Sequence, residues 1–201
     1  MTTALLQTTY FGPVQWYQKL YRYDRCVIEQ HDSYQKQTFR NRCIIATANG
    51  TQALTVPVAH PSPITHHLSP ITKDLRISDH NQWRRVHWNA LQSAYSESPF
   101  FEKKYEFLVD FNEAIRQKMC ELIDIHPFVD YTTTYLPSPI TQYPSPISDF
   151  RDVIHAKHPQ PDPDFTPIKY WQVFQHKHGF LPNLSILDLL FCMGPESVFY
   201  L

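Results

Sequence analysis

The first thirty residues show a strand, a helix and a second strand in an order that constrains the whole fold. Residues 4–10 are typical of a β-strand, and Gly12-Pro13 then interrupts the extended pattern. From residue 13 to 24 apolar residues recur at helical spacing, and residues 25–30 form a second strand-like run. Because these elements in succession form a βαβ unit, the two strands should be parallel neighbours. The sequence therefore predicts an α/β fold.

A β-hairpin is predicted next along the chain. Two runs rich in β-branched residues, 42–46 and 53–58, are separated by Asn49-Gly50. Asn-Gly favours the tight turns that join antiparallel strands, because both residues tolerate a positive φ. We expect this hairpin to extend the sheet begun by the βαβ unit, which would make the sheet mixed.

Amphipathic segments after the hairpin are expected to cover the sheet. Apolar residues at helical spacing predict helices over 79–95, about 99–109, 111–125, 169–176 and 186–192. Residues 130–136 are typical of a further strand. Asn183 or Ser185 is suited to cap the last helix, and Gly194-Pro195 to end it.

Prolines are unusually frequent, with seventeen against only four glycines, and they cluster. The clusters fall at about residues 59–74 and 137–167. Since proline disrupts both helices and central strands, we interpret these segments as loops inserted into a single domain that spans residues 1–201. Exposed connections are the simpler interpretation, and proline segments that bind a protein partner are the alternative.

Composition argues against several classes of protein. Eighteen Lys+Arg against nineteen Asp+Glu give a net charge of -1, so no basic surplus is present to bind a nucleic acid backbone. No apolar run has the length of a membrane span, and the N-terminus lacks the pattern of a secretory signal. The four cysteines are widely spaced without a CxxC pair, which favours reduced, buried thiols. We therefore expect a cytoplasmic protein.

A dense polar stretch, residues 31–42, lies between two short β-branched runs and is the predicted binding site. An arginine fork matches a carboxylate or a phosphate, and in an extended segment Arg40 and Arg42 would face the same side. These residues predict binding of a small anionic metabolite that carries a phosphate or a carboxylate. The alternative is a solvated loop whose cations pair with Glu29 and Asp32.

Three side chains are candidates for moving protons. His31 and Asp32 directly follow the second predicted strand, where parallel sheets present ligand-binding groups. A structural Asp32 would instead cap the following turn. His87 lies on the apolar face of its predicted helix, one turn after Trp83. It is either a core histidine or a catalyst in a pocket that has Trp83 and Tyr95 as one wall.

Recognisable metal and nucleotide motifs are absent from the sequence. The histidine pairs at 66–67, 155 and 158, and 176 and 178 lack the spacing of a zinc site, so we expect no metal. The glycine-rich phosphate loops and the GxSxG nucleophile motif are missing as well. The sequence identifies no cofactor.

Several motifs carry a resemblance to a known family. Residues 10–17 (Tyr-Phe-Gly-Pro-Val-Gln-Trp-Tyr), 34–42 and 54–58, together with 83–87 and 179–195, resemble the WbqC-like protein family in the form seen in Bacteroidetes-type bacteria. The resemblance spans nearly the whole chain. It implies a link to the biosynthesis of bacterial surface polysaccharide, particularly O-antigen.

The same resemblance places several residues at the polar motif positions of the family: Tyr34, Lys36, Asn41, Arg42, His87 and Asp188. Cys192 departs from the pattern, because an asparagine is expected after the Leu-Phe pair. If that asparagine contacts substrate in other members, the contact is weaker in this chain.

Our hypothesis from the sequence is a cytoplasmic enzyme of surface polysaccharide biosynthesis that transfers a group on an anionic activated sugar or acyl precursor. Arg40, Arg42 and Lys36 would hold the anion, His31, Asp32 or His87 would move protons, and Tyr34, Asn41 and Trp83 would orient the substrate. The alternative is a non-catalytic metabolite-binding or scaffold protein of the same pathway.

Overall fold

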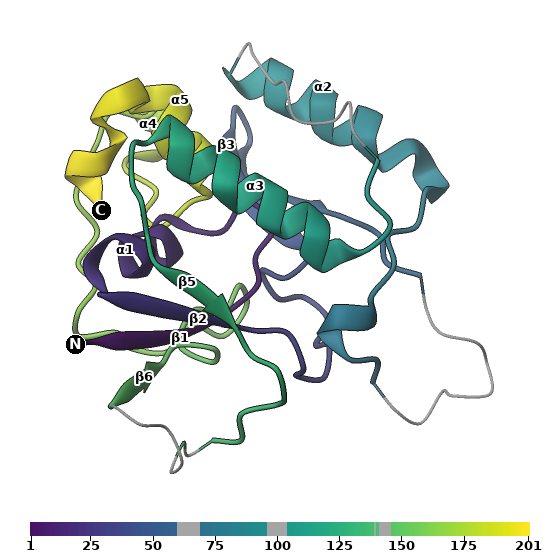
Figure 1. Cartoon of the computed structure of the whole chain (residues 1–201). Helices are drawn as coiled ribbons and strands as arrows, with labels where there is room; N and C mark the ends of the chain where they lie inside the picture. The colour runs from purple at the N-terminus through teal and green to yellow at the C-terminus, as the bar shows by residue number, and fades with distance from the viewer. Residues whose placement is uncertain (60–68, 96–103, 139, 141–145) are drawn as a thin grey trace.

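Four parallel strands form the central sheet of the computed structural model, which describes residues 1–59, 69–95, 104–138, 140 and 146–201 (Figure 1). In order across the sheet, the strands are β5 (Val129–Tyr131), β2 (Arg25–Glu29), β1 (Thr3–Gln7) and β6 (Ile147–Asp149). Each neighbouring pair is parallel, so the carboxyl ends of all four strands meet at one edge. The predicted α/β class is confirmed.

The predicted βαβ unit is also confirmed. Helix α1 (Val14–Arg22) connects β1 to β2 and packs against both strands, which pair in parallel. Gly12 permits the tight turn before this helix, because a Cβ at that position would lie 2.5 Å from Thr9 Oγ1. Strand β1 is buried along its whole length, as is typical of a parallel strand covered on both faces.

The hairpin forms as predicted but does not join the central sheet. Strands β3 (Arg42–Thr47) and β4 (Gly50–Thr55) pair antiparallel, and Gly50 has the positive φ that the turn requires. Among the described residues they make a separate two-stranded sheet. The edge of β3 that faces away from β4 does not pair with the central sheet. It contacts the residue before α5 instead, since Ser185 N–H donates to the Ile44 carbonyl at 2.8 Å.

The helices differ from the sequence prediction mainly in their bounds. The structure has α2 (Trp83–Tyr95), α3 (Leu108–Leu122), α4 (Gln175–His178) and α5 (Ile186–Met193), with 3₁₀ helices at Thr72–Asp74, His80–Gln82 and Gly194–Tyr200. The helix predicted over 99–109 lies partly outside the described residues, and residues 104–107 are not helical. As predicted, Ser185 caps α5, since its hydroxyl accepts from Leu187 N–H.

Strand β6 lies in the segment that we expected to be a loop. Residues 147–149 pair with β1, which makes β1 a central strand. Only three residues long and preceded by prolines, β6 shows no periodicity that could reveal a strand. Residues 147–149 are extended because they form backbone hydrogen bonds with β1.

The part of this predicted loop that follows β6 is anchored to the core by charge. Lys19 Nζ lies 2.7 Å from Asp162 Oδ2, and the two side chains are only 1% and 3% exposed. The same ammonium group lies 4.5 Å from the centre of the Phe150 ring. The segment after β6 is therefore a fixed part of the structure and covers α1.

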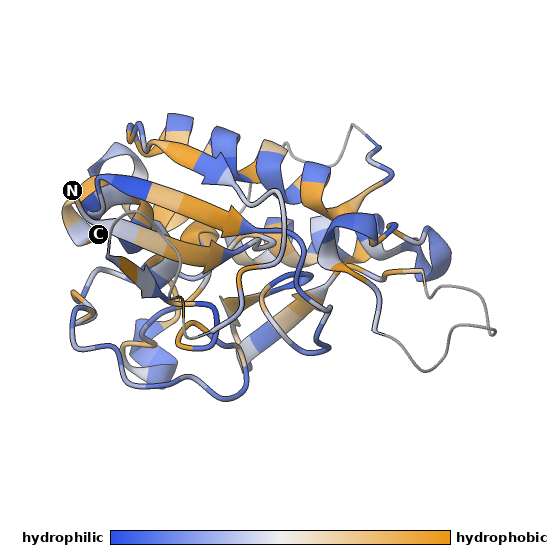
Figure 2. Cartoon of the chain, turned by 60° about the horizontal axis from the view of Figure 1, so that its bottom comes forward, coloured by the Kyte–Doolittle hydropathy of each residue, from blue (hydrophilic) through white to orange (hydrophobic). Residues whose placement is uncertain are grey.

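The apolar residues gather in one core between the sheet and its helices. Figure 2 shows hydrophobic residues along the strands of the sheet, while the long helices alternate hydrophobic and hydrophilic residues. Cys26, Cys43 and Cys120 are buried in this core and Cys192 is half-buried, all as free thiols. Burial raises the pKa of Cys26 to about 12, so this thiol stays protonated and unreactive at neutral pH. None of the described helices is long and apolar enough to cross a membrane.

Candidate functional site

A cavity of about 450 Å³ opens at the edge where β2, β5 and β6 end, and we call it the carboxyl-edge cavity. Ten side chains from the segments that follow these strands and from their neighbours line it: His31, Asp32, Ser33, Gln35, Arg40, Ile71, Tyr135, Ser138, Arg151 and Asp152. Open α/β sheets bind their ligands beyond the carboxyl ends of the strands. The position of the cavity therefore makes it the candidate functional site.

Glu29, the last residue of β2, holds the segments around this cavity together. Its carboxylate is fully buried and accepts hydrogen bonds from His31 N–H at 2.8 Å and from Leu136 N–H at 2.9 Å. The Thr132 hydroxyl, which follows β5, also donates to it at 2.8 Å. One carboxylate thus fixes the chain after β2 and the chain after β5.

Arg151 connects the same carboxylate to β6. Its Nη1 lies 3.3 Å from Glu29 Oε2, and its Nε and Nη2 donate to the Asp149 carboxylate at 2.9 and 2.6 Å. Nη1 also donates to the Leu136 carbonyl, and the Tyr135 ring lies 5.6 Å from the guanidinium carbon. Two carboxylates therefore neutralise Arg151, and they fix its orientation in the wall of the cavity.

Asp32 and Arg40 form a second buried ion pair in the cavity wall. Arg40 Nη2 donates to Asp32 Oδ2, and the Thr72 hydroxyl donates to Asp32 Oδ1 at 2.5 Å. The Arg40 side chain is only 4% exposed, and its Nε has no hydrogen-bond partner among the described residues. The pair confirms that cations of this stretch bind nearby carboxylates, as in our alternative interpretation, but the pair is buried and not solvated.

Of the residues predicted from the sequence, the structure brings His31, Asp32 and Arg40 together in this cavity. The others lie outside its lining: Tyr34, Lys36, Asn41, Arg42, Trp83 and His87. Arg42 Nε donates to Thr55 Oγ1 within the hairpin, and Asn41 Nδ2 donates to the Val56 carbonyl. Arg40 and Arg42 do not share a ligand-facing side, because residues 31–41 form turns and bends and not an extended strand.

His87 is a buried core residue. Its Nδ1 lies 2.8 Å from the Tyr10 hydroxyl, its ring meets the edge of Trp83, and it hydrogen-bonds to the backbone at Thr55. These contacts join α2 to the hairpin and to the turn after β1. Burial lowers the pKa of His87 to about 4, so the ring is uncharged at neutral pH.

We expect His87 to make the stability of the protein fall in mild acid. An unfolded chain takes up a proton at this histidine near pH 6.5, whereas the folded chain does so only near pH 4. Stability present above pH 6.5 is therefore lost as the pH falls through this window, by about 3 kcal/mol in total. Urea unfolding of the wild type and of His87→Gln, measured from pH 7 to pH 4, should show a flatter profile for the variant. Tyr10→Phe, which keeps the imidazole, should retain the steep profile, and equal slopes in all three proteins would contradict the assignment.

Sequence reasoning missed Glu29, Tyr135, Arg151 and Asp152 as parts of the site. Tyr135 lies inside the strand predicted over residues 130–136, but the strand ends at Tyr131, so the rule that located His31 would have found Tyr135 only with the correct strand end. Arg151 and Asp152 carried no such signal, because the strand before them could not be recognised.

Asp188, which the family resemblance placed at a polar motif position, belongs to a buried structural network. Its carboxylate accepts hydrogen bonds from the Tyr95 hydroxyl at 2.7 Å, the Tyr170 hydroxyl at 2.8 Å and Gln172 Nε2 at 3.1 Å. Burial raises the pKa of Asp188 above its usual range. With three donors in place, this carboxylate fixes the start of α5 against α2 and the chain around Tyr170.

The fold and the cavity define an α/β protein with a polar cavity at the carboxyl edge of a parallel sheet. The chain belongs to the WbqC-like protein family, whose model matches residues 7–137. It is 25% identical over 227 residues to the uncharacterized protein Rv1507c of Mycobacterium tuberculosis, an alignment that covers 98% of this chain and 96% of that protein. No solved structure matches the chain.

Proposed function

We propose that this chain is an enzyme of bacterial surface polysaccharide biosynthesis, of the O-antigen type, that acts in the cytoplasm. It would transfer a group on a small anionic precursor, an activated sugar or acyl compound, bound in the carboxyl-edge cavity. The observation that carries the proposal is the presence of His31, Asp32 and Arg40 in one cavity beyond the ends of three parallel strands. The pathway comes from the family resemblance alone.

Each of these three side chains has a distinct role in the proposal. His31 is half-exposed at the cavity, and an imidazole can both accept and donate a proton near neutral pH. Both oxygens of Asp32 are occupied by Arg40 and Thr72, so we assign Asp32 to positioning Arg40. Arg40 would bind the anionic group of the precursor, since it lines the cavity and its buried Nε–H has no partner among the described residues.

Binding of the precursor can be tested with a thermal-shift screen of nucleotide sugars, ATP, acyl-CoA and amino acids. A ligand that binds only the folded protein raises the melting temperature. We expect one class to do so, and Arg40→Gln to weaken its binding by about 10- to 100-fold, as the loss of a charged hydrogen bond implies. Arg42→Gln is the matched control, because this arginine is two positions away and outside the cavity lining. Equal losses in the two variants would rule out the assigned site.

A non-catalytic metabolite-binding or scaffold protein is the second candidate. It is favoured by the pairing of both cavity arginines with carboxylates, which leaves little unbalanced positive charge to stabilise a transition state. His31→Gln distinguishes the two functions once a ligand is known. An enzyme would bind the ligand and lose turnover in this variant, whereas a binding protein would show no turnover in either form.

A further inference from the structure

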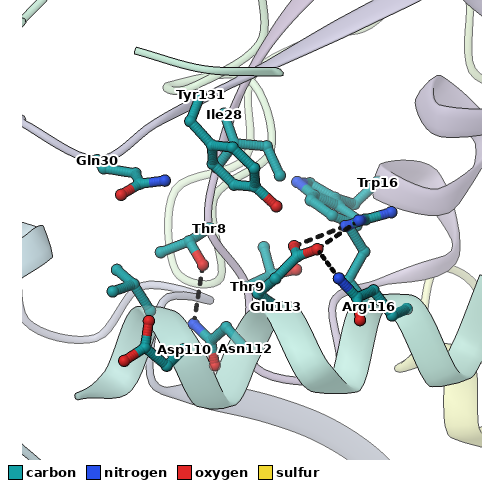
Figure 3. Close-up of a pocket in the computed structure, with 12 residues that line it drawn as sticks. Thr8, Thr9, Trp16, Ile28, Gln30, Asp110, Asn112, Glu113, Arg116 and Tyr131 are labelled. Carbon is teal, nitrogen blue, oxygen red and sulfur yellow. Dashed lines mark hydrogen bonds and ion pairs between the residues drawn. The ribbon is translucent and has the colours of Figure 1, made fainter. Parts of the chain in front are cut away.

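Two cavities lie near the ends of the parallel strands, and their linings differ. Figure 3 shows the smaller one, of about 300 Å³ beside α3, which we call the α3 cavity. Its Trp16 is only 1% exposed, and Arg116 on its wall is paired with Glu113, since Arg116 Nε donates to Glu113 Oε2 at 2.8 Å. The carboxyl-edge cavity instead presents two exposed large apolar side chains, Ile71 and Tyr135, among its polar ones. This mixed lining limits the kind of molecule that fits.

Tyr135 is an exposed aromatic residue that is held in a fixed position. It is 51% exposed, yet both backbone groups of the next residue are bound. Leu136 N–H donates to Glu29 Oε2 at 2.9 Å, and the Leu136 carbonyl accepts from Arg151 Nη1 at 2.7 Å. The Arg151 guanidinium carbon also lies 5.6 Å from the centre of the Tyr135 ring. An aromatic ring held in this way loses little conformational freedom when a ligand packs against it.

Ile71 lines the same cavity and is also fixed through its backbone. It is 42% exposed, and it forms an antiparallel bridge with Ser33. The next residue is held as well, since Thr72 N–H donates to the Asp32 carbonyl at 2.9 Å. Exposed apolar side chains that share one cavity indicate that part of the ligand is apolar. The ligand should therefore have an apolar surface that packs between Ile71 and Tyr135.

Beyond the anion position assigned to Arg40, the polar lining matches neutral hydroxyl groups. The Asp152 carboxylate has no hydrogen bond or ion pair with any residue that the structure describes, so it would repel a second anionic group. Three further polar side chains of the lining have no hydrogen-bond partner in the described part of the chain: Ser33, Gln35 and Ser138. Hydroxyl and amide groups both donate and accept hydrogen bonds, and a ligand hydroxyl can do both in return.

We propose that the carboxyl-edge cavity binds the ring of a sugar, packed against Tyr135 and Ile71. A pyranose ring has apolar C–H faces that can pack on an aromatic ring, and its hydroxyl groups can bond to Asp152 and the other polar side chains of the lining. An acyl chain would match the two apolar side chains only. The inference rests on the proposed function, and of its two precursor classes, activated sugar and acyl compound, the lining favours the sugar.

An NMR titration of the full chain tests the sugar ring with probes that carry no anionic group. The methyl glycosides of glucose, galactose and N-acetylglucosamine present the ring. Sorbitol carries similar hydroxyl groups without a ring, uracil is a planar base, and pentanamide is a neutral acyl chain. We expect at least one glycoside to shift the backbone amides of residues 31–35, 71–72 and 135–136 saturably and to leave those of residues 112–117, beside the α3 cavity, unchanged.

The three other probes should bind about tenfold more weakly than that glycoside or not at all. The absence of a saturable shift with every glycoside would overturn the proposal. Equal or tighter binding of sorbitol, uracil or pentanamide would overturn it as well, and so would shifts confined to residues 112–117.

Variants then connect the response to Tyr135. Because this residue is exposed, Tyr135→Ala should leave the fold intact, and it should weaken binding of the glycoside about tenfold, as loss of an aromatic packing contact implies. Tyr135→Phe keeps the ring and should retain binding. Tyr21→Ala is the matched control, because Tyr21 is also 51% exposed but lies in α1, outside the cavity lining. Unchanged binding in Tyr135→Ala, or equal losses in Tyr135→Ala and Tyr21→Ala, would contradict this position of the ring.

Different results separate the sugar ring from the anion site. An acyl compound whose binding depends on Arg40 and not on Tyr135 would leave the proposed group transfer in place and overturn the sugar ring. A neutral glycoside that binds at Tyr135, while no ligand class depends on Arg40, would support the sugar ring and overturn the anion site.

Discussion

Replacing Lys19 by methionine should destabilise the protein by about 3–5 kcal/mol, although methionine fills a similar volume. The substitution leaves the Asp162 carboxylate almost fully buried without its counter-charge. Gln15 Nε2, which donates to Asp162 Oδ2 at 2.8 Å, supplies only a neutral hydrogen bond in its place. Chemical unfolding in urea at pH 7 measures this change directly.

Two controls separate the charge effect from lost packing. Lys19→Met combined with Asp162→Asn removes both charges, so this double variant should recover a substantial part of the lost stability. Lys118→Met breaks an exposed pair with Glu121 and should cost less than about 1 kcal/mol. A double variant no more stable than Lys19→Met would show that the unpaired Asp162 carboxylate is not the source of the loss.

Arg151→Met should produce a loss of similar size and also disturb the carboxyl-edge cavity. Without the guanidinium, the fully buried Glu29 carboxylate and its neighbour Asp149 face each other with no cation between them. Breaking a buried pair of this kind typically costs about 3–5 kcal/mol. The unfolding free energy should fall accordingly, and amides of residues 132–138 should exchange with solvent faster, because Arg151 also holds the Leu136 carbonyl.

The control for this prediction is Arg25, an arginine at the start of β2. Arg25 pairs with Asp130, but both side chains are 38% exposed, so Arg25→Met should cost less than about 1 kcal/mol. Adding Glu29→Gln to Arg151→Met should restore part of the stability by removing the unpaired buried charge. Equal effects of Arg25→Met and Arg151→Met would mean that burial of the Glu29 network is not the source of the loss.

The parts of the fold that could be predicted are those with local causes. Gly12-Pro13 between a strand and an amphipathic helix defined the βαβ unit, and Asn49-Gly50 defined the hairpin, because turn chemistry acts over a few residues. The position of β6 could not be predicted, since residues 147–149 become a strand only through pairing with β1. For the same reason, the hairpin does not extend the central sheet as expected. The outer edges of β1 and β2 pair instead with β6 and β5, which come later in the chain.

The candidate site could likewise be predicted only where a local pattern defines it. His31 and Asp32 directly follow the second strand, so the sheet-edge rule predicted their position at the carboxyl edge of the sheet. Arg40 was predicted separately from its charge, and the structure places all three in one cavity. The expectation that Arg40 and Arg42 face the same side does not hold, because side chains alternate regularly only in an extended chain. For His87, an apolar helical face allowed both a core role and a catalytic role, and its contacts with Tyr10 and Thr55 place it in the core.

The strand order β5-β2-β1-β6 has a consequence for how the chain folds during its synthesis. Strand β1 meets β2 soon after it leaves the ribosome, but its other edge has no partner until residues 147–149 have been made. Until then the apolar residues Ala4, Leu5 and Leu6 lie on an open strand edge, which is where strands of other chains can add. Pairing across such a sequence separation is also slow. Closure of the sheet by β6 is therefore expected to be a late step, and the carboxyl-edge cavity exists only after it.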